Sequence, residues 1–231
     1  MITTILFDFD NTLVDYMASD IAAMSHMLRE HRGNLDLDAF LDRSVEVIMN
    51  SDAERFASSK DQHYYRFKTT CMEFDIPWDD TFIHDYYDHF IDNVPVFDGV
   101  VPLLQQLNGT VQLGILSNSP YPDEQNRRIT SSGLSGFFGY IGLAADIGFF
   151  KPDKQAFAHA LHHFHATPAE TVFIGDSEQY DIIGAKNAGM TAIKKLSPWN
   201  INSTTVADHK FNEFPELCDL LTTTYHLRIN Q

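Results

Sequence analysis

The chain has 231 residues, of which 44% are hydrophobic, and its formal net charge is −16. This length and composition argue against disorder and suffice for a sizeable core, and the acidic balance disfavours nucleic-acid polymers, whose binding requires basic surfaces. No apolar run reaches membrane-spanning length, and the amino terminus enters a predicted strand without a signal-peptide pattern. We therefore expect a soluble cytoplasmic protein that binds neither membranes nor nucleic acid.

The first predicted element is a buried strand over residues 5–7 that ends in two acids, Asp8 and Asp10. Such apolar runs are typical of parallel strands covered on both faces, and open α/β sheets bind ligands at the carboxyl ends of these strands. Two carboxylates this close resist joint ionisation, unless a cation lies between them or one serves as a nucleophile and the other as an acid or base. The alternative for the pair by itself is a solvated strand end with incidental charges.

Residues 16–94 have a different pattern, in which apolar residues recur at helical spacing without any strand that ends in an acid. The recurring residues are Ile21, Met24, Met27, Leu28, Phe40, Leu41, Val45, Ile48 and Met49. Ser51-Asp52-Ala53-Glu54 has the pattern of a capping box that begins a further helix, and Pro77 separates two later helices. We expect an inserted helical domain over 16–94 and one α/β domain formed by 1–15 and 95–231.

Three further segments place polar residues at predicted strand or helix ends. A buried strand over 111–116 ends in Ser117-Asn118-Ser119, which could bind an anion, although such residues are also ordinary helix caps. Lys151 follows two phenylalanines and precedes a proline. A single lysine is usually a solvated surface charge, but a lysine among apolar neighbours is better placed to bind a phosphate group. Asp176 ends a strand over 171–175, and Asp181 follows five residues later, a spacing that suits one hard cation.

The rest of this part alternates strands with helices, which predicts a doubly wound parallel sheet of the Rossmann-like α/β class. Residues 167–170 form a predicted capped turn before the strand that ends in Asp176. Cys71 and Cys218 lie far apart, so we expect unpaired thiols.

In this order, the motifs resemble those of the haloacid dehalogenase superfamily, and the resemblance covers nearly the whole chain. The helical insertion after the first strand is similar to the cap of the family's first subfamily, which would close over the site and exclude water. Two departures are small: Asn11 stands where glycine is commonest, and Tyr180 where asparagine often precedes the final acid.

The resemblance implies a phosphatase that uses Mg²⁺ and an aspartyl-phosphate. Asp8 would be the nucleophile, and Asp10 would protonate the leaving oxygen and then activate water. Ser117 and Lys151 would bind the phosphoryl oxygens, and Thr12 would orient the turn after the strand. The residues expected to contact the substrate are Thr12, Tyr16 and Asn118. The metal would be held by Asp8, Asp176 and the carbonyl of Asp10. Asp181 would bind it directly or through water.

For the substrate, we expect a small phosphate ester, with nucleoside 5′-monophosphates as the preferred hypothesis. The predicted cap is rich in aromatic residues, most of which should form its core, and Tyr16 is the best placed to meet a planar leaving group. A sugar-phosphate or phosphoglycolate phosphatase and a phosphoglucomutase-like transferase remain alternatives. A dehalogenase would not need Asp10, and a receiver-type signalling module or a silent binding protein does not fit the motifs. The chain is expected to be a monomer or a homodimer.

Overall fold

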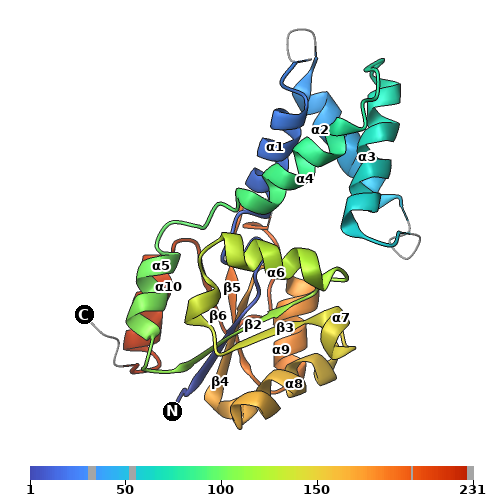
Figure 1. Ribbon diagram of the computed structural model, residues 1–231. Coiled ribbons are helices and arrows are strands. Elements are labelled where there is room, and N and C mark those ends of the chain that lie inside the picture. Colours follow the sequence, from blue (N-terminus) through green and yellow to red (C-terminus); the bar gives the residue numbers. More distant parts are fainter. Residues whose placement is uncertain (31–34, 52–55, 199, 228–231) are drawn as a thin grey trace. The chain divides into compact units, whose positions relative to one another are not determined.

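The structure is a computed structural model that describes residues 1–30, 35–51, 56–198 and 200–227 (Figure 1). The chain forms two compact units, Tyr16–Val94 and the combination of Met1–Asp15 with Pro95–Gln231. The smaller unit is inserted after the first strand of the larger one, as the helical-cap prediction requires. Each unit is described separately below.

The larger unit is built on a six-stranded sheet in which every neighbouring pair is parallel. The strands are β1 (Thr4–Phe7), β2 (Gln112–Ser117), β3 (Tyr140–Leu143), β4 (Thr171–Gly175), β5 (Thr191–Lys195) and β6 (His209–Phe211). Their order is β3-β2-β1-β4-β5-β6, so successive strands are added on one side of β1 up to β3 and on its other side from β4 onward. The doubly wound α/β fold is therefore confirmed, and β1 lies between β2 and β4, where ligands bind in such sheets.

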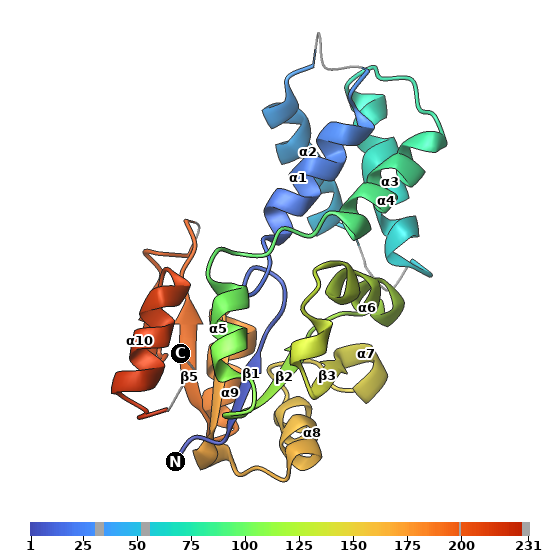
Figure 2. The same ribbon diagram turned by 60° about the vertical axis from the view of Figure 1, so that its left-hand side comes forward.

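Helices cover both faces of this sheet, as the two views show (Figures 1 and 2). They are α5 (Val100–Leu107), α6 (Pro122–Ser131), α7 (Ala144–Ile147), α8 (Lys154–Phe164), α9 (Ile183–Asn187) and α10 (Phe214–Thr223). On one face, Phe157 and Ala160 of α8 pack with Leu6, Leu116 and Phe173 of the central strands. All four residues of β1 are buried because both faces of the strand are covered, which accounts for the apolar run at residues 5–7.

The smaller unit consists of α1 (Tyr16–Met27), α2 (Leu37–Met49), α3 (Ser59–Glu73) and α4 (Thr81–Asp92). The break predicted at Pro77 is confirmed, since α3 ends before it and α4 begins after it. Met24, Met27 and Phe40 enter the core as their spacing suggests, but Ile21 and Met49 are 39% and 77% exposed. Three residues of the predicted capping box Ser51-Asp52-Ala53-Glu54, Asp52 to Glu54, lie outside the described part of the chain.

Several smaller expectations also have an outcome. The capped turn at 167–170 is confirmed, because Thr167 and Glu170 form a capping box around a short helix, Pro168–Glu170. Cys71 and Cys218 are unpaired thiols. Within the described residues, no helix combines the length and the apolar character that crossing a membrane requires.

Candidate active site

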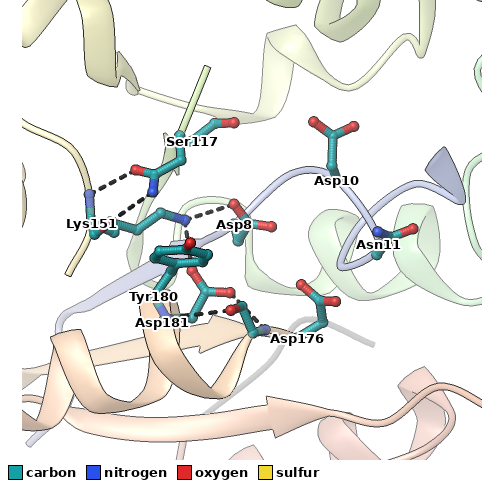
Figure 3. A pocket seen from close by; sticks show the side chains of 10 residues that line it. Asp8, Asp10, Asn11, Ser117, Lys151, Asp176, Tyr180 and Asp181 are labelled. Carbon is teal, nitrogen blue, oxygen red and sulfur yellow. Dashed lines mark hydrogen bonds and ion pairs between the residues drawn. The ribbon is translucent and has the colours of Figure 1, made fainter. Parts of the chain in front are cut away.

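The carboxyl ends of β1, β2 and β4 meet at one edge of the sheet and surround a pocket of about 310 Å³ (Figure 3). Asp8 follows β1, Ser117 ends β2, and Asp176 follows β4. The residues that line the pocket are Asp8, Asp10, Asn11, Ser117, Asn118, Lys151, Asp176, Ser177, Tyr180 and Asp181. Residues up to 173 positions apart in the sequence thus come together because β1 pairs with both β2 and β4.

Lys151 joins two acids at the base of this pocket. Its Nζ atom donates to Asp8 Oδ1 and to Asp181 Oδ1, both at 2.7 Å, and the lysine side chain is 2% exposed. Burial opposes the charge of Lys151, but the carboxylates of Asp181 and Asp8 hold its pKa above the ordinary value. Burial raises the pKa of Asp8 well above its usual range, Lys151 opposes this shift, and the charges of Asp181 and Asp176 add to it. The lysine therefore stabilises the ionised form of Asp8.

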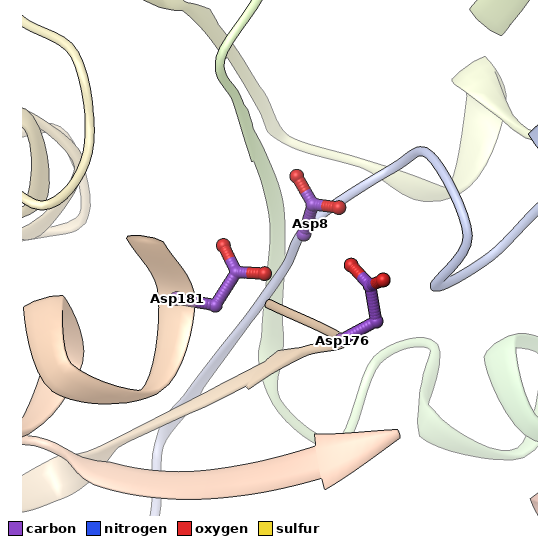
Figure 4. Close-up of side chains that lie close together, drawn as sticks. All are labelled: Asp8, Asp176 and Asp181. Carbon is purple, nitrogen blue, oxygen red and sulfur yellow. The ribbon is translucent and has the colours of Figure 1, made fainter. Parts of the chain in front are cut away.

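Asp8, Asp176 and Asp181 form a cluster in which one carboxylate oxygen of each lies within 4.8 Å of the others (Figure 4). The pKa of Asp176 is raised to about 7, first by burial and then by the charge of Asp181. Among the described residues that line the pocket, Lys151 is the only cation, so the cluster has an excess of negative charge. Hard divalent cations prefer oxygen ligands, and the cluster fits such a cation.

The backbone after β4 brings Asp181 back to the cluster. A turn of π-helix, Glu178–Ile182, returns the chain toward the sheet, and the Ser177 N–H donates to Asp181 Oδ2 at 2.9 Å. A Cβ atom on Gly175 would lie 2.5 Å from the Asp181 carboxyl carbon. Glycine is therefore required at the end of β4 for this acid to approach, which gives a steric reason for Gly175 immediately before Asp176.

Asp10 is held by two residues that the sequence motifs did not single out. Arg128 Nη1 donates to Asp10 Oδ1 and Gln125 Nε2 donates to Asp10 Oδ2, each at 2.7 Å. Both residues belong to α6 and are three positions apart, so they lie on one face of the helix. A polar pair with this spacing in the helix after Ser117 was the available signal, but it is also the ordinary pattern of a solvated helix face.

Asn118 lines the pocket, but its amide is engaged by the main chain of Lys151. Its Oδ1 accepts from the Lys151 N–H at 2.7 Å, and its Nδ2 donates to the Lys151 carbonyl at 2.8 Å. This pair of bonds ties the loop of Lys151 to the end of β2. The predicted contact of Asn118 with substrate stays a prediction, and its observed contacts position the lysine.

Thr12 and Tyr16 are not among the residues that line the pocket. Thr12 is fully buried and its hydroxyl donates weakly to Asp8 Oδ2, at 3.4 Å. Asn11 before it has a φ of 57°, a left-handed conformation that glycine and asparagine adopt most readily, which explains why either suits this turn. Tyr16 belongs to the helical unit, where its ring packs edge-on against Phe90.

The sequence and the fold are similar to those of known proteins. A sequence model described as haloacid dehalogenase-like hydrolase matches residues 5–195. The chain is 26% identical to a glyceraldehyde 3-phosphate phosphatase of Pyrococcus furiosus over 95% of this chain and 93% of that protein. It is 30% identical to the pyrimidine 5′-nucleotidase YjjG of Escherichia coli over 40% of this chain and 41% of that one.

A solved structure of the protein YfnB from Bacillus subtilis, bound to magnesium, has a similar fold. Its TM-score is 0.76 at 23% identity, and the match covers 96% of this chain and 99% of that one. At this identity the likeness concerns the fold alone.

Proposed function

The chain belongs to the haloacid dehalogenase-like hydrolase family, and from this premise we propose that it is a Mg²⁺-dependent phosphomonoester hydrolase that works through an aspartyl-phosphate on Asp8. The observation that carries the proposal is the position of Asp8, with Lys151 at 2.7 Å and the second acid Asp10 in the same pocket. The reaction of a carboxylate with a phosphate dianion requires positive charge, and a second acid supplies the proton transfers.

The chemistry proceeds in two balanced steps. In the first, an Asp8 oxygen attacks phosphorus, the bond from phosphorus to the leaving oxygen breaks, and the Asp10 proton passes to that oxygen. In the second, water attacks phosphorus, one water proton passes to Asp10, and the bond to Asp8 breaks with its electron pair returning to the carboxylate. Ser117 and Lys151 are the pocket residues available to bind the phosphoryl oxygens.

The three-acid cluster supplies the ligands for the metal in this proposal. Asp8, Asp176 and Asp181 would hold Mg²⁺, together with the Asp10 carbonyl that the family resemblance implies. When bound, Mg²⁺ neutralises charge on the phosphoryl group. The magnesium in the YfnB structure supports the choice of this ion.

Asp10 also separates this proposal from carbon–halogen hydrolysis. A halide leaves as a stable anion, whereas an alkoxide must be protonated as it leaves, so only the phosphate reaction needs an acid beside the nucleophile. A phosphotransferase of the phosphoglucomutase type would use the same groups, and the products formed from a sugar phosphate distinguish it from a hydrolase.

The first prediction concerns Asp8 and the metal. Hydrolysis of nitrophenyl phosphate should require Mg²⁺ and stop after chelation, and Asp8→Asn should abolish turnover without unfolding the protein, because it removes one charge from a crowded acidic cluster. Turnover is followed by nitrophenolate release, and folding by circular dichroism. Asp219→Asn, at an exposed position on α10, is the matched control and should remain active. Substantial activity of Asp8→Asn, or full activity in chelator, would contradict the mechanism.

For the substrate, nucleoside 5′-monophosphates are the class that we favour. Tyr180 lines the pocket from the turn before Asp181 and is 51% exposed, so its ring is free to stack against a base. The partial likeness to a pyrimidine 5′-nucleotidase supports the same class. The longer match to a glyceraldehyde 3-phosphate phosphatase makes triose phosphates the second candidate.

The second prediction tests Tyr180 as a stacking platform. Stacking is worth roughly 1–3 kcal/mol, so nucleoside monophosphates should exceed ringless esters in kcat/KM by about tenfold or more. Tyr180→Ala should remove this preference and Tyr180→Phe should keep it, because phenylalanine retains the ring. The measurement compares kcat/KM for nucleoside monophosphates, hexose phosphates, phosphoglycolate and glyceraldehyde 3-phosphate. If nucleotides rank last, the substrate class is wrong and the phosphatase mechanism stands.

A further inference from the structure

The carboxylate of Asp10 has both of its oxygens bound by α6 and points away from Asp8 (Figure 3). Arg128 and Gln125 each donate to it at 2.7 Å, and each carboxyl oxygen keeps a second lone pair that can carry the proton to be transferred. An aspartate side chain at a strand end can adopt several rotamers, and two donors from a rigid helix select one of them. Asp10 is thus oriented by residues more than 110 positions away in the sequence.

The two donors also order each other. Arg128 Nη1 donates to Gln125 Oε1 at 3.3 Å, so the amide nitrogen of Gln125 must face the other way, toward Asp10. The same nitrogen lies 3.2 Å from Ser117 Oγ, to which it donates. One hydrogen-bond network therefore connects the second acid of the site with the hydroxyl that ends β2.

The network is buried on the side of α6 and open on the side of the pocket. Arg128 is fully buried and Gln125 is 3% exposed, whereas the Asp10 side chain is 28% exposed and lines the pocket. Burying a guanidinium is costly, and a buried ion pair is often no more stable than apolar residues of the same volume. Here the buried charge is directed at a carboxylate of the pocket.

We propose that Arg128 and Gln125 are positioning residues that hold the Asp10 carboxylate in the orientation from which it exchanges protons with the leaving oxygen and with water. The inference rests on the proposed phosphatase function. Neither residue gives or takes a proton. Arg128 and Gln125 act on the reaction only through Asp10, whose proton passes to the leaving oxygen as the ester bond breaks and is replaced from the attacking water.

The experiment compares two phosphate esters that differ in how much their leaving groups need a proton. A nitrophenolate leaves readily without one, whereas the alkoxide of phosphoglycolate requires it, and kcat/KM reports the steps up to departure of the leaving group. Arg128→Met should lower kcat/KM for phosphoglycolate at least tenfold more than for nitrophenyl phosphate. Arg128→Lys should recover part of the loss, and Gln125→Ala should show the same selectivity with a smaller effect. The matched control is Arg127→Met, which removes an exposed arginine next to Arg128 on α6 and should change neither value.

A double-variant cycle tests whether Arg128 acts through Asp10. In an Asp10→Asn background, Arg128→Met should cause no further loss of kcat with either ester, because the group that it positions is gone. Full additivity of the two losses, or an equal loss with both esters in Arg128→Met and in Gln125→Ala, would overturn the positioning role. If Arg128→Met does not fold by circular dichroism, Gln125→Ala decides the question by the same criterion. If the unmodified protein does not hydrolyse phosphoglycolate, a nucleoside 5′-monophosphate serves as the alkyl ester, and failure to hydrolyse any of these esters, nitrophenyl phosphate included, would instead overturn the proposed function.

Discussion

At the scale of single residues, Lys151 places a positive charge in the interior of the protein. It is buried between Asp8 and Asp181, and its main chain is fixed by Asn118. Its charge compensates the two acids, and in the proposed mechanism the same charge would bind the phosphoryl oxygens of the substrate. The proposal therefore gives Lys151 two contributions, one to the integrity of the site and one to the reaction.

The third prediction follows from these two contributions. Lys151→Ala should lower kcat and raise KM together, with a loss in kcat/KM of about 10²-fold or more, because the lost charge faces the transferring group. The same variant should unfold at lower temperature, since it leaves Asp8 and Asp181 buried without their cation. Steady-state kinetics and thermal unfolding on the same samples separate the effects. Normal kinetics per folded molecule, with only stability reduced, would assign Lys151 a structural role.

At the scale of elements, a buried ion pair connects the helices of the smaller unit. Arg66 of α3 binds both oxygens of Asp20 on α1 at 2.9 Å, and also donates to Ser44 of α2. Tyr86 of α4 donates to Asp20 at 2.6 Å. Burial opposes ionisation of Asp20, but the Arg66 charge and the hydrogen bonds lower its pKa below the ordinary value. One carboxylate thus fixes how four helices pack.

The fourth prediction is that this carboxylate controls the stability of the helical unit. Asp20→Ala should lower its free energy of unfolding by about 3–5 kcal/mol, because Arg66 loses its buried partner. The pKa of Asp20 is depressed in the folded state, so its contribution is complete above its unfolded pKa, near 4, and is lost as the pH falls further.

Urea unfolding provides the measurement, followed by fluorescence of Trp78 in a Trp199→Phe background. The parent should lose stability below about pH 4 more steeply than Asp20→Ala does. Glu73→Ala breaks an exposed ion pair with Arg43 in the same unit and should have little effect. Equal pH dependence of the parent and Asp20→Ala would show that another group governs acid unfolding.

At the scale of the whole molecule, the sheet order explains what the sequence could reveal. Three site residues were predictable because they stand at or just after the end of an apolar strand: Asp8, Ser117 and Asp176. Parallel strands bring their carboxyl ends to one edge of the sheet. Gln125 and Arg128 were not predictable, because their role depends on where α6 lies beside the end of β1. That placement comes from tertiary packing, and the local signal, two polar residues three positions apart, is equally the pattern of a solvated helix face.

The aromatic residues of residues 16–94 show the opposite case. Phe67, Tyr86 and Phe90 form part of the core of the helical unit, as expected for most aromatic residues of this segment. In the sequence, Tyr180 is only a departure from the family pattern. Among the described residues that line the pocket, it is the aromatic one. The aromatic residues of the helical core could be predicted from their side-chain type. The exposed ring of Tyr180 could be placed at the pocket only from the fold.

The central claim is that Asp8 accepts the phosphoryl group. The most direct measurement stops turnover of nitrophenyl phosphate rapidly with acid and locates added phosphoryl mass on peptides of the chain. The account predicts one phosphoryl group on Asp8 during turnover and none in Asp8→Asn. Sustained Mg²⁺-dependent turnover with no phosphoryl group on Asp8, or with the group on another residue, would contradict it.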